Sequence, residues 1–331
     1  MGGDGGVPIR WGRGYLGAMD LPTAIIEACR RRDPLHETGE LTGYRLFHGE
    51  GDGVPGLTID RMGELALIER SASLEVVVEE IADLLLRNAP VSRVALRGAR
   101  REQRGPHPAP MESLRGETVT GPLEILEHGL RFLTAPDERR ASGFFFDTRP
   151  VRRWLRSHSS GRRITNTFAH TGSLGVAAAV GGARSVLHID NKRSPLEVAA
   201  EHHRRNGVPL DERSFLKGNV YQQLGRAGRR GVKVDGVVLD PPPVVPRRMA
   251  PRAPVGQDFP QLASLAAPLL AEGGWLLCCF NREDRSHEEG EREVLEGAGV
   301  PLRIVERGTS GIDFPATSPE RRLRWSVFLR G

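Results

Sequence analysis

The second half of the chain alternates between two apolar patterns, and this alternation restricts the fold more than any other property of the sequence. Short apolar runs have the length of strands, and the longer stretches between them repeat apolar residues at helical spacing. The strand-like runs are residues 164–168, 186–189, 234–239, 275–280, 302–305 and 323–329, and the helical patterns are residues 174–180, 195–206, 261–270 and 287–296. Such alternation is typical of βαβ units. We therefore predict an α/β fold with a parallel sheet that helices cover on both faces.

The first half of the chain predicts a smaller α+β unit. Residues 1–20 contain seven glycines and are expected to form a tail. Further expectations are a helix at 22–32, two strands within 44–69, a helix at 74–86, a strand at 91–96, a loop over 98–117 and strand structure at 125–133 around a His128-Gly129 hairpin turn. The predicted domains are a flexible tail and short helix at 1–38, a small domain at 39–135 and a larger domain at 136–331.

Composition excludes several classes of protein. No run approaches the roughly 18 to 20 apolar residues of a membrane span, and the N-terminal residues lack the apolar stretch of a secretory signal. This predicts a cytoplasmic protein. The three cysteines, Cys29, Cys278 and Cys279, lack metal-ligand spacing, so neither a metal site nor a disulfide framework is expected. The net charge is +5 and only three of the 47 basic residues are lysines. Arginine suits phosphate binding, but genomic base composition explains the same excess.

Two candidate binding segments follow strands of the predicted sheet, where open α/β sheets bind their ligands. Residues 166–172 combine a strand end, the small residues Ala169 and Gly172, and the start of a helix that offers free N–H groups. Asp190 ends the next strand, where a carboxylate can accept both hydroxyls of a ribose. An ordinary turn and a helix cap are the structural alternatives. Together the two segments favour a cofactor that contains adenosine.

A third candidate is the Asp240-Pro241-Pro242-Pro243 segment after the strand-like run at 234–239. Proline cannot continue a central strand, so Asp240 is held at the end of the strand in a rigid turn. Its carboxylate, together with carbonyl groups fixed by the prolines, can accept hydrogen bonds from a nucleobase edge or a substrate amine. A plain proline-rich turn is the structural alternative.

Five segments of the chain together resemble a known family. In order they read GELTGYRLFHGEGDGVPGLTIDR (39–61), SGFFFDTRPVRRWL (142–155), NTFAHTGSLGVAAAVGGARSVLHID (166–190), LDPPP (239–243) and LLAEGGWLL (269–277). They resemble the class I S-adenosylmethionine-dependent methyltransferases of large-subunit ribosomal RNA, over roughly residues 35–330. The resemblance implies a Rossmann-like domain with a mostly parallel seven-stranded sheet, preceded by a small α+β domain. It also implies S-adenosylmethionine as the cofactor and RNA as the partner.

The resemblance also implies which residues bind the cofactor. These are Phe145, Asp147, Arg149, Phe168, Ala169, Thr171, Gly172, Asp190, Asn191, Asn219 and Asp240. Asp190 would hold the ribose hydroxyls, and Arg149 is a natural partner for the methionine carboxylate. Asn219 departs from the family pattern, which has an acid at this position for the adenine amine, and this weakens that contact.

The family has a cytosine-C5 branch and a guanine-N7 branch. The cytosine branch needs a cysteine nucleophile, and here Asn281 stands at the corresponding position. Cys279 lies two residues earlier on the same face of the strand and could substitute, although both adjacent cysteines also suit a buried strand. Phe280-Asn281-Arg282 resembles the guanine-N7 branch. We therefore expect Asp240, Pro241, Pro242 and Asn281 to position the target base, with Arg282 also contacting its edge.

Substrate capture is expected to depend on arginines. Only about 38 residues precede Gly39, too few for the RNA-binding module that often starts cytosine-type members. The candidates for RNA contact are the loop 97–115, Arg152, Arg153, Arg247 and Arg248, and a solvated surface is the alternative. A small-molecule methyltransferase on the same fold and a non-catalytic RNA-binding protein remain alternatives. The oligomeric state stays open.

Overall fold

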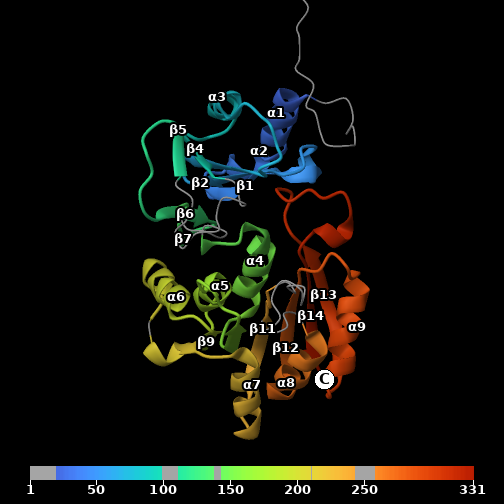
Figure 1. Cartoon of the computed structure of the whole chain (residues 1–331). Coiled ribbons are helices and arrows are strands. Elements are labelled where there is room, and N and C mark those ends of the chain that lie inside the picture. Colours follow the sequence, from blue (N-terminus) through green and yellow to red (C-terminus); the bar gives the residue numbers. More distant parts are fainter. Residues whose placement is uncertain (1–19, 99–110, 138–142, 210, 243–257) are drawn as a thin grey trace, which may run out of the picture. The chain divides into compact units, whose positions relative to one another are not determined.

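The computed structural model describes residues 20–98, 111–137, 143–209, 211–242 and 258–331 (Figure 1). The chain divides into two compact units. The first comprises Met1–Phe146, described from residue 20 on, with Ile312–Thr317, and the second comprises Asp147–Gly311 with Ser318–Gly331. The predicted domains divide the chain at residue 135 and place 312–317 in the larger domain, and the compact units differ from them in both respects.

The second unit is built on a seven-stranded sheet with the order β10-β9-β8-β11-β12-β14-β13. The strands are β8 (Arg163–Thr167), β9 (Ser185–Asp190), β10 (Phe215–Lys217), β11 (Val234–Leu239), β12 (Leu270–Phe280), β13 (Leu302–Thr309) and β14 (Arg324–Arg330). The first five strands of that order are parallel, and β14 runs antiparallel to both β12 and β13. This confirms the expected mostly parallel sheet. The strand order reverses at β8, which lies between β9 and β11, and such a switch point is where α/β sheets bind ligands.

Helices cover both faces of this sheet, as the sequence predicts (Figure 1). They are α4 (Arg149–His158), α5 (Ser173–Val180), α6 (Arg193–Arg205), α7 (Val220–Arg229), α8 (Phe259–Ala266) and α9 (His287–Gly297). Because side chains alternate along a strand, Val238 packs in the core beneath α4 and α5, whereas Val237 and Leu239 pack beneath α7, α8 and α9. Sequence analysis did not predict α4 or α7. In α4, only Val151, Trp154 and Leu155 carry the helical apolar spacing.

The first unit contains a five-stranded sheet in the order β1-β2-β3-β4-β5 and a separate β6-β7 hairpin. Its elements are α1 (Leu21–Arg31), α2 (Asp33–His36), β1 (Gly43–His48), β2 (Leu57–Met62), β3 (Leu65–Arg70), α3 (Val78–Asn88), β4 (Arg93–Arg97), β5 (Met111–Arg115), β6 (Leu123–Glu127) and β7 (Leu130–Thr134). The expected hairpin turn is confirmed, with left-handed backbone at His128 (φ 49°) and Gly129 (φ 82°). Two expectations were wrong. Three strands occupy the region where two were expected, and β5 lies within the predicted loop, because pairing with β4 stabilises a segment with little apolar periodicity.

Residues 312–317 belong to the first unit because of a buried polar network. The Arg32 side chain is fully buried, and its two terminal nitrogens donate to the Asp52 carboxylate at 2.8 and 2.6 Å. Arg32 also donates to the Asp313 carbonyl oxygen at 2.9 Å, and the Phe314 ring packs edge-on against His48. A buried guanidinium needs all of these acceptors, so this network fixes the segment in place. In the described part of the chain, no helix combines the length and apolar character that crossing a bilayer requires.

Candidate active site

The loop after β8 forms one side of the site. Thr167 ends the strand, and the backbone then turns through left-handed conformations at Phe168 (φ 52°), His170 (φ 47°) and Gly172 (φ 77°) before α5 begins. Such conformations are uncommon outside glycine and are maintained only when the surroundings enforce them. Gly172 has a second requirement, because a Cβ atom there would lie 2.5 Å from Cβ of Ala199. The loop is therefore tightly constrained, as expected of a cradle for a ligand.

Asp190 links this loop to the neighbouring strand ends. One of its carboxylate oxygens accepts the backbone N–H of His170 at 2.9 Å, and the other accepts that of Lys192 at 3.0 Å. Its own carbonyl oxygen accepts the N–H of Gly218, just beyond β10, at 2.8 Å. Each carboxylate oxygen has a second lone pair beyond the one already used. The carboxylate is thus fixed in orientation and retains the capacity to accept two hydroxyls of a ribose.

Three buried histidines lie beneath the loop, and sequence analysis did not identify them. A ring nitrogen of His202 lies 2.9 Å from the Thr171 carbonyl oxygen, and the Nε2 atoms of His188 and His203 lie 3.0 Å apart. The second ring nitrogen of His188 lies 3.3 Å from the Asn166 amide nitrogen. Burial lowers the pKa of His188 to about 3 and that of His203 to about 4. Both rings are therefore neutral at pH 7. Their signal in the sequence was weak: one histidine in a strand and a pair in a helical pattern.

Asp240 directly follows β11 and keeps part of its surface exposed. The pKa of its carboxyl group is raised to about 7, first by burial and second by the negative charge of Asp147. A hydrogen bond with the Cys279 thiol and the positive charge of Arg152 act in the opposite direction. Arg152 is fully buried and donates to the Thr148 hydroxyl at 2.7 Å. The expectation that Arg152 contacts RNA at the surface was wrong, because this guanidinium belongs to the interior beside Asp240.

The loop after β12 lies next to Asp240. In the parallel pairing of the two strands, Leu239 is level with Cys278, so Asp240 follows at the level of Cys279 and Asn281 lies two residues further on. The Asn281 side chain forms no hydrogen bond to any other residue that the structure describes and is partly exposed. Arg282 pairs with Asp284 at 2.6 Å. The sheet thus brings Asp240 and Asn281 to the same edge, as the sequence predicts.

The other predicted cofactor residues differ in their surroundings. Ala169 and Thr171 are buried in the loop after β8, and Arg149 is the buried first residue of α4. The Asn219 side-chain oxygen caps α7 by accepting the N–H of Gln222 at 3.1 Å. Asn191 is exposed after β9. Phe145 is 44% exposed and belongs to the first compact unit.

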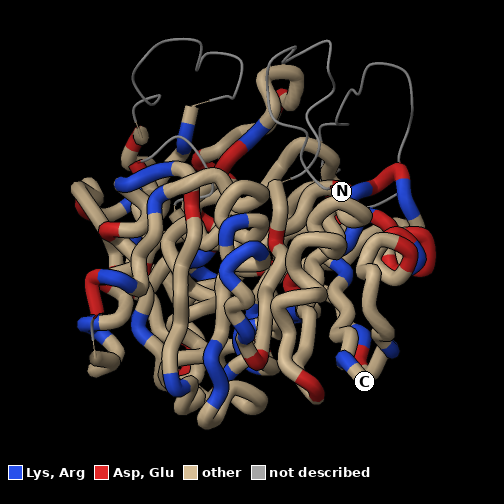
Figure 2. The backbone as a smooth tube through the Cα atoms, turned by 90° about the horizontal axis from the view of Figure 1, so that it is seen from below, with Lys and Arg blue, Asp and Glu red and all other residues tan. Residues whose placement is uncertain are grey.

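The arginines predicted to capture RNA are only partly available. Arg97 is buried and pairs with Glu69 at 2.8 Å, and Arg115 pairs with Asp83 at 2.8 Å. Most of the loop between them, and also Arg247, Arg248 and Pro243, lie outside the described residues. Arg153 is exposed. Basic and acidic positions are interspersed along the backbone (Figure 2). Arg97 and Arg115 are therefore held in ion pairs within the first unit, whereas the sequence alone presents them as candidates for RNA contact.

The reversal of strand order at β8, the constrained loop after it and the fixed carboxylate at the end of β9 define a Rossmann-like α/β protein with a site for a nucleoside-containing cofactor. The sequence model of S-adenosylmethionine-dependent methyltransferases matches residues 45–329. The chain therefore belongs to this family, and it is an enzyme that uses S-adenosylmethionine.

Individual relatives agree with this assignment. A ribosomal RNA large subunit methyltransferase I from Aeromonas salmonicida (strain A449) is 31% identical over 290 residues, which are 86% of this chain and 73% of the relative. A putative SAM-dependent methyltransferase from Streptococcus mutans has the same fold, with a TM-score of 0.79 at 21% identity over 95% of this chain and 82% of that chain. A putative methyltransferase complexed with SAH gives a TM-score of 0.79 at 20% identity, over 95% and 83% of the two chains.

Proposed function

We propose that this enzyme methylates a base of RNA, with large-subunit ribosomal RNA as the substrate and guanine N7 as the target atom. The name of the Aeromonas relative supports the RNA class. The observation that carries the choice of atom is that the loop after β12 offers Asn281 and no cysteine, whereas Cys279, which hydrogen-bonds Asp240, is fully buried within β12. Such a site can orient a base but cannot attack it covalently.

Guanine N7 suits a site of this kind. Its lone pair is already nucleophilic, so methylation needs alignment with the methyl donor rather than a general base or a covalent adduct. Bound S-adenosylmethionine supplies a methyl group on a positively charged sulfur. The Asp190 carboxylate would hold its ribose, and the loop 168–172 would hold the part that carries the sulfur. The base would leave its stack to reach the site.

Asp240 and Asn281 would orient the base. In its ionised form the Asp240 carboxylate accepts hydrogen bonds, and the Watson–Crick edge of guanine offers N–H donors. The Asn281 amide both donates and accepts, so it can contact a base edge without a change of charge. Pro241 and Pro242 hold the turn after Asp240 rigid. Arg282 adds a guanidinium next to Asn281 for the base or its phosphate.

Methylation of cytosine C5 is the second candidate, and it requires a thiolate. Burial raises the pKa of Cys279 well above its ordinary value, and the negative charge of Asp240 raises it further. Its side chain is fully buried. A buried thiol in such surroundings is a poor nucleophile. These features favour a purely structural Cys279, and they support guanine N7 over cytosine C5.

The test is transfer of labelled methyl groups to ribosomal RNA from cells that lack this protein, followed by nucleoside mass analysis. We expect 7-methylguanosine, and Cys279→Ser should keep activity within about threefold, like the control Cys29→Ser in the core of the first unit. If the product were 5-methylcytidine, and if Cys279→Ser no longer formed it, the target atom would be cytosine C5 and not guanine N7. No transfer to RNA despite cofactor binding would contradict the RNA proposal. RNA binding should also weaken steeply with salt through counterion release, unlike binding of a small neutral substrate.

The role of Asp190 gives a separate prediction. Replacing Asp190 with alanine should raise the Kd for S-adenosylmethionine by about 10-fold to 100-fold, because hydrogen bonds to a charged group contribute about 1.5–3 kcal/mol. Isothermal titration calorimetry measures this. Asp211→Ala is the matched control. Asp211 is exposed, and its carboxylate also accepts a backbone N–H, that of Arg213, at a distance of 2.9 Å. An unchanged Kd in Asp190→Ala would remove Asp190 from the cofactor site.

A further inference from the structure

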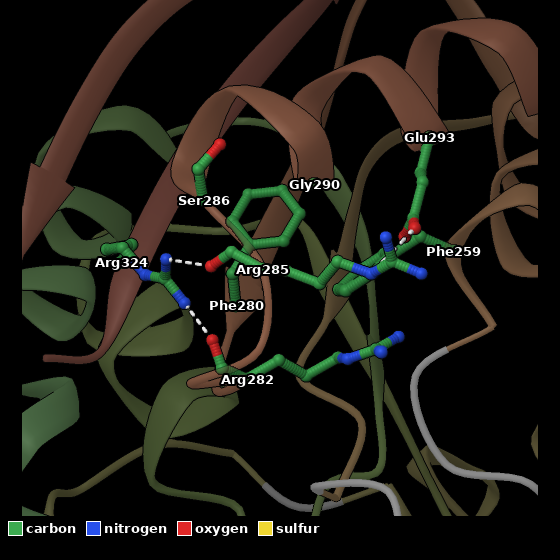
Figure 3. A pocket seen from close by; sticks show the side chains of 8 residues that line it. All are labelled: Phe259, Phe280, Arg282, Arg285, Ser286, Gly290, Glu293 and Arg324. Atoms are coloured by element: carbon green, nitrogen blue, oxygen red, sulfur yellow. Dashed lines mark hydrogen bonds and ion pairs between the residues drawn. The ribbon is translucent and has the colours of Figure 1, made fainter. Parts of the chain in front are cut away.

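Arg324, the first residue of β14, bonds the loop that carries Asn281 and Arg282. One terminal nitrogen of its guanidinium donates to the Arg285 carbonyl oxygen at 2.6 Å, and the other donates to the Arg282 carbonyl oxygen. Figure 3 shows both bonds, with Arg324 on one side of the Phe280 ring and the side chains of Arg282 and Arg285 extending away from it. Arg324, on β14, thus holds the backbone of residues 282 and 285, which belong to the loop after the neighbouring strand β12.

The burial of Arg324 indicates that these two bonds matter. The residue is only 2% exposed, and among the described residues no carboxylate forms an ion pair with it. Its Nε atom is buried and has no acceptor there. The negative charges of Glu320 and Glu288 act on this buried cation from beyond ion-pair distance. Burying a cation is costly, so the two loop carbonyls that accept its hydrogen bonds are its direct compensation. The guanidinium fork fits two carbonyls at once, which a lysine cannot do.

The same strand also holds the far end of the loop. Ser286 begins α9 with a capping box in which Ser286 and Glu289 bond each other's backbone N–H groups. The His287 ring nitrogen Nε2 lies 2.7 Å from the Ser326 hydroxyl, and Ser326 lies two residues after Arg324 on the same face of β14. Residues 282–287 are therefore anchored to β14 at both ends. Asn281 immediately precedes the first anchor.

We propose that Arg324 is a positioning residue for the substrate base. By fixing the backbone of residues 282–285, it sets where Asn281 and Arg282 lie relative to Asp240 at the edge of the sheet. The inference rests on the proposed function, because it gives Asn281 and Arg282 contact with the base. Arg324 itself acts only through the loop.

The experiment compares Arg324→Lys with Arg330→Lys in the full chain. Arg330 ends the same strand and donates to the carbonyl oxygens of Leu270 and Pro268, at the opposite end of the sheet from the loop. Both of these bonds come from one terminal nitrogen, so Arg330 is a control for the loss of a guanidinium that bonds backbone carbonyls elsewhere on β14. We expect Arg324→Lys to lower kcat/KM for RNA about tenfold or more, since small misplacements of contacting groups have effects of this size. The Kd for S-adenosylmethionine should stay within about twofold in both variants.

Hydrogen exchange tests the positioning role without an activity assay. Amides of residues 281–286 should exchange faster in Arg324→Lys than in the wild type, and Arg330→Lys should leave these amides unchanged. Arg324→Gln gives a second variant, and Arg324→Lys keeps the positive charge in case Arg324→Gln does not fold. Unchanged exchange at 281–286, or equal losses of kcat/KM in Arg324→Lys and Arg330→Lys, would overturn the inference. A wild-type enzyme that methylates no RNA, with faster exchange in Arg324→Lys, would instead refute the proposed function and leave Arg324 as the residue that holds this loop.

Discussion

Replacing Asp240 with alanine is expected to lower kcat for RNA methylation by about 100-fold or more, because a base that is not held in line with the methyl donor reacts slowly. Asp240 is the only carboxylate that the described part of the turn after β11 offers to the base, and the prolines after it leave little freedom to compensate. Single-turnover transfer from labelled S-adenosylmethionine measures the effect. The Kd for the cofactor should change much less than kcat.

Asp235→Ala provides the control for this substitution. Asp235 lies on the same strand but near its other end, where its carboxylate accepts bonds from Arg163 at 3.0 and 3.1 Å. Its loss removes an ion pair from the surface and should leave kcat within about twofold. If Asp240→Ala kept turnover at the level of Asp235→Ala, Asp240 would have no part in catalysis.

The raised pKa of Asp240 also predicts how the rate depends on pH. Burial raises that pKa to about 7, so below pH 7 the carboxyl is mostly protonated and cannot accept both bonds from the base. The rate of the chemical step should therefore increase as the pH rises through about 7. Removing the nearby charge in Asp147→Asn should move the midpoint to lower pH, because Asp147 raises the pKa of Asp240. A rate that is independent of pH between 6 and 8 would contradict this role.

The second large effect concerns stability in acid. Burial lowers the pKa of His188 to about 3 and those of His48 and His203 to about 4, whereas in the unfolded chain each is near 6.5. Between these values the unfolded state binds protons that the folded state excludes. The free energy of unfolding should therefore be largest above pH 6.5 and decrease as the pH falls toward 4. Each histidine contributes about 1.4 kcal/mol per pH unit in this window.

Asp240 has the opposite effect on the pH dependence of stability, and its contribution cancels that of one of the three histidines. Its folded pKa is about 7 and its unfolded value is 3.8, so the folded state takes up a proton as the pH falls. The net slope from these four groups is on the order of 3 kcal/mol per pH unit, and urea unfolding between pH 4.5 and 6.5 measures it. His188→Gln should reduce this slope by about the contribution of one histidine, because the variant lacks the buried ring that excludes a proton. The exposed His128, replaced by asparagine, should leave it unchanged. An equal slope in His188→Gln and the wild type would contradict the buried neutral ring.

Local sequence predicted most strands of the second unit and the placement of two candidate site residues at strand ends. Strand-length apolar runs predicted β8, β9 and β11, and polar residues directly after them predicted Asp190 and Asp240 at one edge of the sheet. These predictions succeed because strand periodicity and the end of a strand are local properties. The break at Pro241, for example, follows from the chemistry of proline alone.

Only the tertiary structure decided which distant segments meet. In the sequence, nothing distinguishes Arg324 from the many other arginines. In the structure, β14 lies between β12 and β13, and this position brings Arg324 into contact with the loop after β12. Arg152 reads as a surface cation, yet it is buried near Asp240. His188 and His203 meet because β9 and α6 pack together. Such contacts depend on long-range pairing and on burial, which local propensity does not encode. The sequence by itself therefore determined the long apolar strands of the second unit, their ends and the family. Packing decided the short strands β5 and β10, the partners of the buried charges and the order of the sheet.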